Sequence, residues 1–419
     1  MRFRPPFCPN KRCKLHLDPE TAEGKALRRV KWFAPFGWYQ TKVRGPVPRF
    51  RCRHCGKTFS RQTFRLDYYV KRTVDYDQLR DRLTSCSSVR AVGNSLGISP
   101  DSVSNRISRL SRQYLSACAE ALSEMAPEES VVADGFESFA VSQYFPNNIT
   151  LLGGADSQYV LFADYATLRR KGRMTKWQKH LRAQLEKLYR ADPRAVQASF
   201  TRVLDTVADL AGRTEQRPFC LRTDEKTDYR RALAGHKTLT AARQAGAFTH
   251  ATFDSKAPRT IMNPLFTVNY FDRQLRKDLA EHVRETTRFA RNVCHTMERL
   301  WVIIGHYNFY KRYRITDPVS VERTHADVAG LGRRQVAHAL RHVTTQRRFL
   351  SFQSLPAAFE QSWKRGYETP LRTLKPKVLR ALKKAARKGE VDLEELKKSL
   401  GLDSLTHERP QYLPKYALN

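Results

Sequence analysis

Two pairs of cysteines near the start of the chain have the spacing of a metal site. Four residues separate Cys8 from Cys13, and two residues separate Cys52 from Cys55. Zn²⁺ takes four soft ligands in a tetrahedron, and closely spaced cysteines on two turns supply them. A bound metal also replaces the hydrophobic core that a segment of about 60 residues struggles to build. The pattern therefore predicts one structural Zn²⁺ ion held by Cys8, Cys13, Cys52 and Cys55.

The first pair is wider than the usual two-residue gap, which leaves two alternatives open. His16 and His54 stand close enough in the sequence to compete for a ligand position. The four cysteines could instead be unpaired, buried side chains. The remaining cysteines are isolated and are expected to be small core residues; they are Cys86, Cys118, Cys220 and Cys294.

Three aspartates further along the chain stand where predicted strands and a predicted helix meet. Asp134 and Asp224 each end a predicted strand, and Asp272 is expected to start a helix whose Leu275 and Leu279 pack on a sheet. An acid on such a packed face is costly unless a metal or partner neutralises it. Three convergent carboxylates suit two Mg²⁺ or Mn²⁺ ions, which would clamp the attacking and leaving oxygens in phosphodiester chemistry. The alternative for each aspartate is a turn or a helix cap.

Other acids near this region are weaker candidates. Glu281 follows Asp272 by nine residues and would point to the opposite side of a helix at 100° per residue. Asp156, Asp164 and Asp228 also lie near predicted strand ends.

Residues 88–110 have the pattern of two helices around a short turn at Gly97. Ser99 suits a helix N-cap, and Pro100 suits the first helical position. One face of the second helix is apolar, whereas the other carries donors suited to phosphates and base edges. This pattern favours a helix-turn-helix that binds DNA through Ser102, Asn105, Arg106 and Arg109. An ordinary amphipathic helical hairpin is the alternative.

The elements around the aspartates predict a mixed α/β central domain. Short apolar runs at 131–134, 149–152 and 159–162 are typical of consecutive strands, and residues 218–221 predict another buried strand. Residues 174–212 are charged and helical, with a break expected at Pro193. Residues 272–310 also have a helical pattern. After Pro318 the chain is expected to be helical and basic, with a lysine-rich stretch at 379–398.

The charge of the chain predicts its partner. Lysine and arginine number 76 against 41 aspartates and glutamates, so the net charge is 76 − 41 = +35. A protein this basic most often binds a polyanion, and nucleic acid is favoured over a ribosome-associated or merely well-solvated protein. Residues 1–75 hold 19 basic and 5 acidic residues, which concentrates about +14 of this charge at the start of the chain.

Composition excludes several other classes. With 41% hydrophobic residues the chain can build a core, so wholesale disorder is excluded. No apolar run approaches the roughly 18 residues of a membrane span, so no membrane partner is expected. The first residues lack an apolar signal core, and eight cysteines are too few for a disulfide scaffold. We expect a cytoplasmic, nucleoid-associated protein.

Over most of residues 8–315 the chain resembles bacterial insertion-sequence transposases of the insertion-sequence-one type. The motifs that carry the resemblance are the block around the second cysteine pair, the helix-turn-helix, and two short runs that contain Asp134 and Asp224. The most specific is a block from Tyr270 through Thr286 and Asn292 to Asn308.

The resemblance implies a zinc ribbon and a helix-turn-helix in front of a ribonuclease-H-like catalytic domain with an Asp-Asp-Glu triad. Carried over, it makes Asp134, Asp224 and Asp272 the magnesium ligands. The chain departs from the family at the third position, where Asp272 precedes Arg273 and the family has glutamate before arginine. The departure points either to a helix that sits slightly closer or to a decayed copy.

Together these inferences predict a multidomain DNA transposase. The expected domains are a zinc ribbon at 1–70, a helix-turn-helix domain at 71–126, an α/β catalytic domain with a helical insertion at 127–315, and a basic helical C-terminal region at 316–419. The expected partner is double-stranded DNA, both element ends and target, bound by a homodimer or larger synaptic assembly. The alternatives are a catalytically decayed zinc-dependent DNA-binding regulator and a related metal-dependent nuclease.

Overall fold

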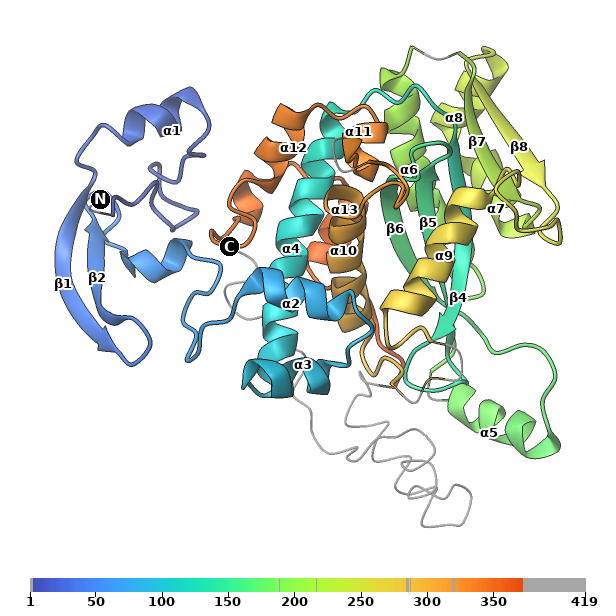
Figure 1. Ribbon diagram of the computed structural model, residues 1–419, viewed down its shortest axis with the longest axis horizontal. Helices are drawn as coiled ribbons and strands as arrows, with labels where there is room; N and C mark the ends of the chain where they lie inside the picture. Colours follow the sequence, from blue (N-terminus) through green and yellow to red (C-terminus); the bar gives the residue numbers. More distant parts are fainter. Residues whose placement is uncertain are drawn as a thin grey trace.

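A computed structural model describes residues 3–371, except 188, 216, 284, 285, 287, 319 and 320. Within these residues the chain is an α/β protein: a four-cysteine module, a group of helices, and a mixed five-stranded sheet with helices on its faces (Figure 1). No helix in these ranges combines the length and apolarity that crossing a membrane requires.

The N-terminal module, residues 3–65, is a small antiparallel sheet with one short helix. It contains α1 (Ala22–Leu27), β1 (Phe33–Thr41), β2 (Gly45–Cys52), β3 (Thr58–Ser60) and the 3₁₀ turn η1 (Arg61–Phe64). The sheet order is β1-β2-β3, so β1 is an edge strand. A bulge between Pro35 and Trp38 contains Gly37, whose φ of +74° suits glycine.

Helices α2 (Tyr76–Leu83), α3 (Val89–Leu96) and α4 (Pro100–Glu124) follow, and their ends agree with the local sequence signals. The Ser88 and Ser99 side chains cap α3 and α4, each accepting a hydrogen bond from a backbone N–H of the first turn. Gly97 ends α3 in the left-handed conformation, with φ of +63°. Gly93 is required by close packing, because a Cβ there would lie 2.7 Å from the carbonyl oxygen of Ile98.

The central sheet has the order β6-β5-β4-β7-β8. Strands β4 (Val131–Phe139), β5 (Pro146–Gly154) and β6 (Val160–Thr167) are antiparallel neighbours, which confirms the three predicted consecutive strands. Strand β7 (Phe219–Asp224) pairs in parallel with β4 and confirms the fourth, and β8 (Phe248–Phe253) pairs in parallel with β7.

Helices cover both faces of this sheet. Residues between β6 and β7 form α5 (Lys176–Glu186) and α6 (Ala195–Arg213), separated around Pro193 as predicted. Helix α6 packs on one face, where Ser199 contacts Thr150 of β5, and α7 (Thr227–Gly235) and α8 (Lys237–Gln244) lie beside it. The opposite face holds α9 (Phe266–Asp278), whose Thr267 hydroxyl donates a hydrogen bond to the Gly154 carbonyl, and α10 (Val293–Phe309).

The main core continues past residue 315. Helices α11 (His325–Val328), α12 (Arg333–Leu340) and α13 (Ala357–Trp363) and the 3₁₀ turn η3 (Leu350–Phe352) follow α10. Phe359 and Trp363 are buried in the same core as the sheet, and so is the second half of α4. The four-domain division remains a prediction, and the lysine-rich stretch at 379–398 lies outside the described residues.

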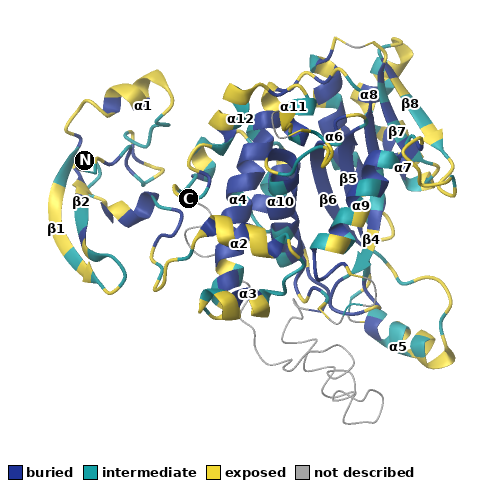
Figure 2. Ribbon diagram, in the orientation of Figure 1, coloured by how far each residue is buried: buried dark blue, intermediate teal, exposed yellow. Residues whose placement is uncertain are grey.

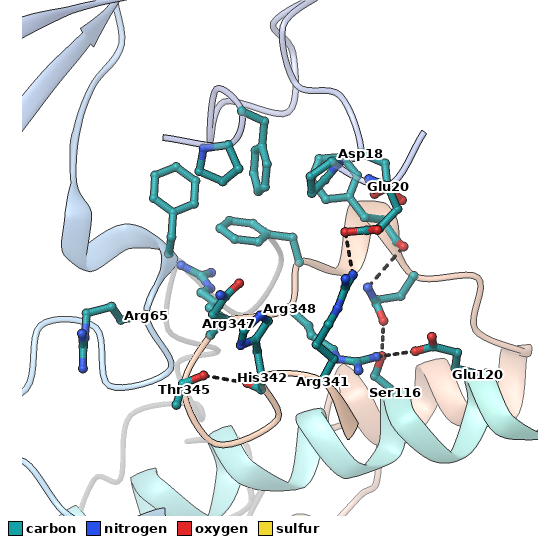
Figure 3. Close-up of a pocket in the computed structure, with 18 of the residues that line it drawn as sticks. Asp18, Glu20, Arg65, Ser116, Glu120, Arg341, His342, Thr345, Arg347 and Arg348 are labelled. Atoms are coloured by element: carbon teal, nitrogen blue, oxygen red, sulfur yellow. Dashed lines mark hydrogen bonds and ion pairs between the residues drawn. The ribbon is translucent and has the colours of Figure 1, made fainter. Parts of the chain in front are cut away.

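The N-terminal module docks on a segment that is distant in sequence. The Phe7 ring packs on Phe349 and Phe352, and the Arg347 N–H donates a hydrogen bond to the Phe64 carbonyl. Beside this contact lies a cavity of about 800 Å³, lined by the module, α4 and residues 338–355 (Figure 3). Arg341 pairs with Glu20 at 2.7 Å at the rim of this cavity and so ties the two segments together.

Candidate metal centres

The four predicted zinc ligands come together in the N-terminal module. Their Sγ atoms all lie within 4.8 Å of one another, with 3.6 Å between Cys8 and Cys55 and 3.9 Å between Cys13 and Cys52. A tetrahedral zinc with Zn–S bonds of about 2.3 Å requires sulfur atoms about 3.8 Å apart. The cluster can therefore hold a structural zinc ion.

Two tight turns present the four thiols. The Gly56 N–H donates a hydrogen bond to the Cys52 carbonyl, and Gly56 itself has a φ of +69°, which closes the turn after the second pair. On the other turn the Cys13 N–H donates to the Asn10 carbonyl. The four-residue gap of the first pair thus forms a turn equivalent to the shorter gap of the second.

The two histidines predicted as competitors are not part of the four-sulfur group. His16 uses both ring nitrogens, Nδ1 at 2.7 Å from the Cys8 carbonyl and Nε2 at 2.6 Å from the Ser351 hydroxyl. His54 Nδ1 lies 3.4 Å from the Cys13 Sγ, as a hydrogen-bond partner outside the four-sulfur group. The geometry therefore favours four sulfur ligands.

Thiol ionisation differs within the cluster. Burial raises the pKa of Cys8 above its ordinary value. Burial also opposes ionisation of Cys55, but hydrogen bonds from the Lys57 backbone and the Asn10 side chain outweigh it and lower its pKa to about 7. Because thiolates are the zinc ligands, the lowered pKa of Cys55 favours its binding to zinc.

The first two aspartates lie level with one another on neighbouring strands. Strands β4 and β7 run in parallel with Val132 opposite Arg222, and Asp134 and Asp224 each follow two residues later. Side chains at equivalent positions of paired strands point to the same face. The pairing therefore places the two carboxylates side by side where β7 ends.

Asp272 reaches the same face from the covering helix. It does not start a helix, as predicted, but lies six residues after Phe266, the first residue of α9. The prediction was wrong because Phe266–Phe271 continues the helical pattern toward the N-terminus. One turn after Asp272, Arg276 lies over the Phe136 ring of β4 at 4.7 Å, which shows that α9 crosses the face carrying Asp134.

The three carboxylates act on one another electrostatically. Burial, followed by the charge of Asp224, raises the pKa of Asp134 to about 6. Burial, followed by the charge of Asp134, raises the pKa of Asp272 to about 8. The Oδ1 atom of Asp272 is buried without a hydrogen-bond partner. Asp134 Oδ1 and Asp224 Oδ1 each accept a backbone hydrogen bond, from Gly135 and Lys226. Carboxylate oxygens that repel one another are donors of the type that binds Mg²⁺ or Mn²⁺.

Several neighbours of the aspartates escaped the sequence analysis. Lys226 and Arg259 both lower the pKa of Asp134, and the Lys226 ammonium donates a hydrogen bond to Asn148 at 3.2 Å. The buried Tyr229 hydroxyl has no hydrogen-bond partner and feels the charges of all three aspartates. Lys226 follows Asp224 by two residues and so could have been found, whereas Asn148 and Arg259 required the fold.

Two of the weaker acids, Glu281 and Asp164, are paired with other residues. Glu281 is buried in an ion pair with Arg299 of α10, and Nε of Arg299 lies 2.9 Å from it. Asp164 lies inside β6 and not at its end. Arg202 and the Tyr367 hydroxyl donate hydrogen bonds to its carboxylate. Structural partners neutralise both carboxylates, so neither is a candidate ligand.

The face predicted to bind DNA on α4 differs from expectation. Arg106 is buried and donates a hydrogen bond to the Arg72 carbonyl at 3.1 Å. Arg109 is half-buried and donates to the Leu66 and Tyr68 carbonyls. The prediction that both arginines face solvent was wrong, because residues 66–72 pack along this side of α4. Of the four predicted residues, Asn105 is exposed and Ser102 is half-buried.

Neither a scan of protein-family models nor a search of curated proteins found a match to this chain. The interpretation of both sites therefore depends on their own chemistry.

We expect one zinc ion per chain in the purified protein, measured by elemental analysis. Replacing Cys52 with Ser should abolish this zinc, because three sulfurs and a hydroxyl bind it poorly. Proteolysis should then cut residues 3–65 first, since the metal stabilises this module. Cys220→Ser, which changes a cysteine of β7 outside the cluster, should keep its zinc. Full zinc content in the Cys52 variant would contradict the assignment.

The raised pKa of Asp272 predicts a pH-dependent stability. The folded state holds this proton up to about pH 8, whereas the unfolded chain releases it near pH 4, so stability should fall as the pH rises between these values. Without divalent ions, Asp272→Asn should therefore melt higher than wild type at pH 8.5, by at least about 2–4 °C. The two proteins should melt alike near pH 4.

Divalent ions should reverse this order. Mg²⁺ at millimolar concentration should raise the melting temperature of the wild type at pH 8.5, because binding to the folded state alone stabilises it. The Asp272 variant should not respond, whereas Asp209→Asn, which changes an exposed aspartate of α6, should respond like wild type. Equal responses in all three proteins would rule out a metal site at Asp272.

Proposed function

We propose that the chain is a DNA transposase that binds the ends of its own insertion sequence and cuts and joins DNA strands. The observation that carries the proposal is the placement of Asp134 and Asp224 on one sheet face, beneath the α9 helix that carries Asp272, with repulsion between Asp134 and each of the other two. In the described part of the chain none of the three forms an ion pair with an arginine or lysine, although Asp134 and Asp224 accept hydrogen bonds from the backbone N–H groups of Gly135 and Lys226.

The sheet around the aspartates supports a ribonuclease-H-like interpretation. Three antiparallel strands are followed by two parallel ones, and the aspartates come from the central strand β4, its parallel neighbour β7 and the covering helix α9. Ligand sites of open α/β sheets form at the carboxyl ends of strands, and Asp224 is the last residue of β7. Asp134, Asp224 and Asp272 follow one another in the chain in the order of the expected Asp-Asp-Glu triad. The third acid, Asp272, has a shorter side chain than the expected glutamate.

The three aspartates would hold two Mg²⁺ ions. When bound, such ions activate the attacking oxygen and stabilise the leaving oxygen of a phosphodiester. The chain's own part is to position charge. Lys226 and Arg259 bring positive charge to the edge of the acids, which favours approach of a DNA phosphate. Asn148, at the end of the Lys226 hydrogen bond, orients that ammonium.

DNA binding belongs to the residues before the sheet. The four-cysteine module, interpreted as a zinc ribbon, and the α3–α4 pair, interpreted as a helix-turn-helix, precede the aspartates in the chain. Both lie in a protein of net charge +35, so most of the affinity comes from phosphate contacts and falls steeply with salt. A dimer or larger assembly would bring two element ends together.

The test is strand cleavage and joining. Purified protein is mixed with plasmid DNA that carries the coding sequence and its native flanks, with Mg²⁺ or Mn²⁺. Asp134→Asn, Asp224→Asn and Asp272→Asn should each lose cleavage by more than about 100-fold, because even outer partners of a metal site are worth about 10–100-fold. Asp209→Asn should cut like wild type.

The remaining outcomes separate the alternatives. Binding of the flanks without cleavage in the wild type would indicate a decayed copy that acts as a regulator, which the aspartate at position 272 favours. Strands that are cut and never joined would indicate a nuclease.

A further inference from the structure

The loop between β8 and α9 holds two large apolar side chains in solvent. Ile261 is 72% exposed and Met262 is 84% exposed, and the loop around them is exposed along most of its length (Figure 2). We call these two residues the apolar tip. Single exposed apolar residues are ordinary on a protein surface, but two adjacent side chains this open are not. Packing within the chain does not require apolar residues at these positions.

A β-turn presents the apolar tip. The Asn263 N–H donates a hydrogen bond to the Thr260 carbonyl at 3.1 Å, so Ile261 and Met262 are the two central residues of the turn. Central turn positions are dominated by Gly, Asn, Asp, Pro and Ser, which suit the backbone of a turn. Two long apolar side chains in these positions point to a contact outside the chain.

Asn263 fastens both sides of the loop to each other. Its side chain is buried, and its Nδ2 donates hydrogen bonds to the carbonyls of Ala257 at 3.4 Å and Pro258 at 2.8 Å. Its Oδ1 accepts a hydrogen bond from the Leu265 N–H at 2.8 Å. The apolar tip is therefore held in one place, which reduces the conformational entropy that binding would cost.

The loop lies beside the three aspartates. It leaves β8 after Phe253, which is paired with Asp224 of β7, and it leads into α9. Arg259 precedes the apolar tip by two residues, and its positive charge acts to lower the pKa of both Asp134 and Asp272. Neighbouring Cα atoms are about 3.8 Å apart, so the tip begins within about 8 Å of the Arg259 backbone. The apolar tip thus stands at the edge of the candidate catalytic site.

The charges of the loop suit a duplex. Lys256 and Arg259 are exposed, and the one acid of the loop, Asp254, accepts a hydrogen bond from the Lys256 N–H. Basic side chains can meet the phosphates of DNA while neighbouring apolar ones reach the stacked bases. A second copy of this chain, which has a net charge of +35, is a poorer match because like charges repel.

We propose that the apolar tip is a wedge that enters a base step of duplex DNA beside the aspartates and unstacks it. Isoleucine and methionine are among the residues that proteins insert between base steps, and the insertion kinks the duplex. Such a kink would bring the backbone of one strand closer to the aspartates than a straight duplex allows.

The inference rests on the proposed function, because it requires that DNA reach the aspartates. It adds how the duplex is deformed there and which residues deform it. It requires neither cleavage nor knowledge of the element ends, so it can be tested apart from the cutting and joining of strands.

The test compares a matched duplex with the same duplex carrying one central T·T mismatch. Each has about 30 base pairs, and the mismatch lowers the cost of unstacking. Fluorescence anisotropy of the full chain in Ca²⁺ should show that wild type binds the mismatched duplex about tenfold more tightly, which corresponds to about 1.4 kcal/mol. The double variant Ile261→Ser/Met262→Ser should bind both duplexes alike, because it has no wedge to insert.

A fluorescent base reports the unstacking itself. 2-Aminopurine placed next to the mismatch should brighten when wild type binds, since stacking quenches its fluorescence, and should stay dim with the serine variant. The double variant Ile261→Leu/Met262→Leu should keep both effects, because it keeps apolar side chains. Ile315→Ser, at an isoleucine that is 86% exposed between α10 and α11, is the matched control and should behave like wild type.

The other outcomes separate the wedge from DNA binding. Equal affinity of wild type for the two duplexes would overturn the wedge and leave DNA binding intact. The wedge would also fall if the serine variant kept the mismatch preference, or if Ile315→Ser lost it equally. A smaller oligomer in the serine variant with its mismatch preference unchanged would assign the apolar tip to a contact between copies. Failure to bind either duplex would overturn this inference together with the proposed function.

Discussion

The parallel pairing of β4 with β7 is the constraint on which the candidate catalytic site depends. It sets Asp134 and Asp224 side by side, although 90 positions separate them in the chain. A shift of one residue in this register would turn one carboxylate to the opposite face of the sheet. The large apolar core on both faces maintains the register, because slippage would expose buried residues on the whole strand. Burial of apolar residues along these strands thus offsets the free-energy cost of holding the acids close to one another.

A second consequence of this core is a rigid connection between the sheet and the helices before it. Helix α4 has 25 residues; its first half packs with α2 and α3, and its second half joins the core of the sheet. It approaches α10 so closely that a Cβ at Gly305 would collide with the Tyr114 ring. The start of α4 is therefore held in a defined position relative to the aspartates, because α4 is one continuous helix.

Local signals in the sequence predicted the features that depend on local chemistry. The four cysteines, the caps at Ser88 and Ser99 and four of the five central strands follow from residue type and spacing. Strand β8 was missed because apolar and polar residues are mixed within Phe248–Phe253, so the segment contains no apolar run. The interpretation of Arg106 and Arg109 failed for a different reason. Helical periodicity identifies two faces of a helix, but it does not show that residues 66–72 return to cover the polar one.

The charge distribution surrounds the candidate acidic site with basic residues. The charge of Asp224 adds to burial in raising the pKa of Asp134, and the charge of Asp134 does the same for Asp272, so ionised acids here would repel a phosphate. Two groups of basic residues counter this repulsion. One lies beside the aspartates, and the other is the stretch at 24–66, which contains no aspartate or glutamate. Lys226 and Arg259 act within the site, whereas the positive charge of the N-terminal module acts on an approaching anion over the Debye length of about 8–10 Å. Divalent ions, if bound as we propose, would convert the acids from a repulsive cluster into an attractive one. Without metal, the raised pKa values of Asp134 and Asp272 mean that protons take over part of that neutralisation.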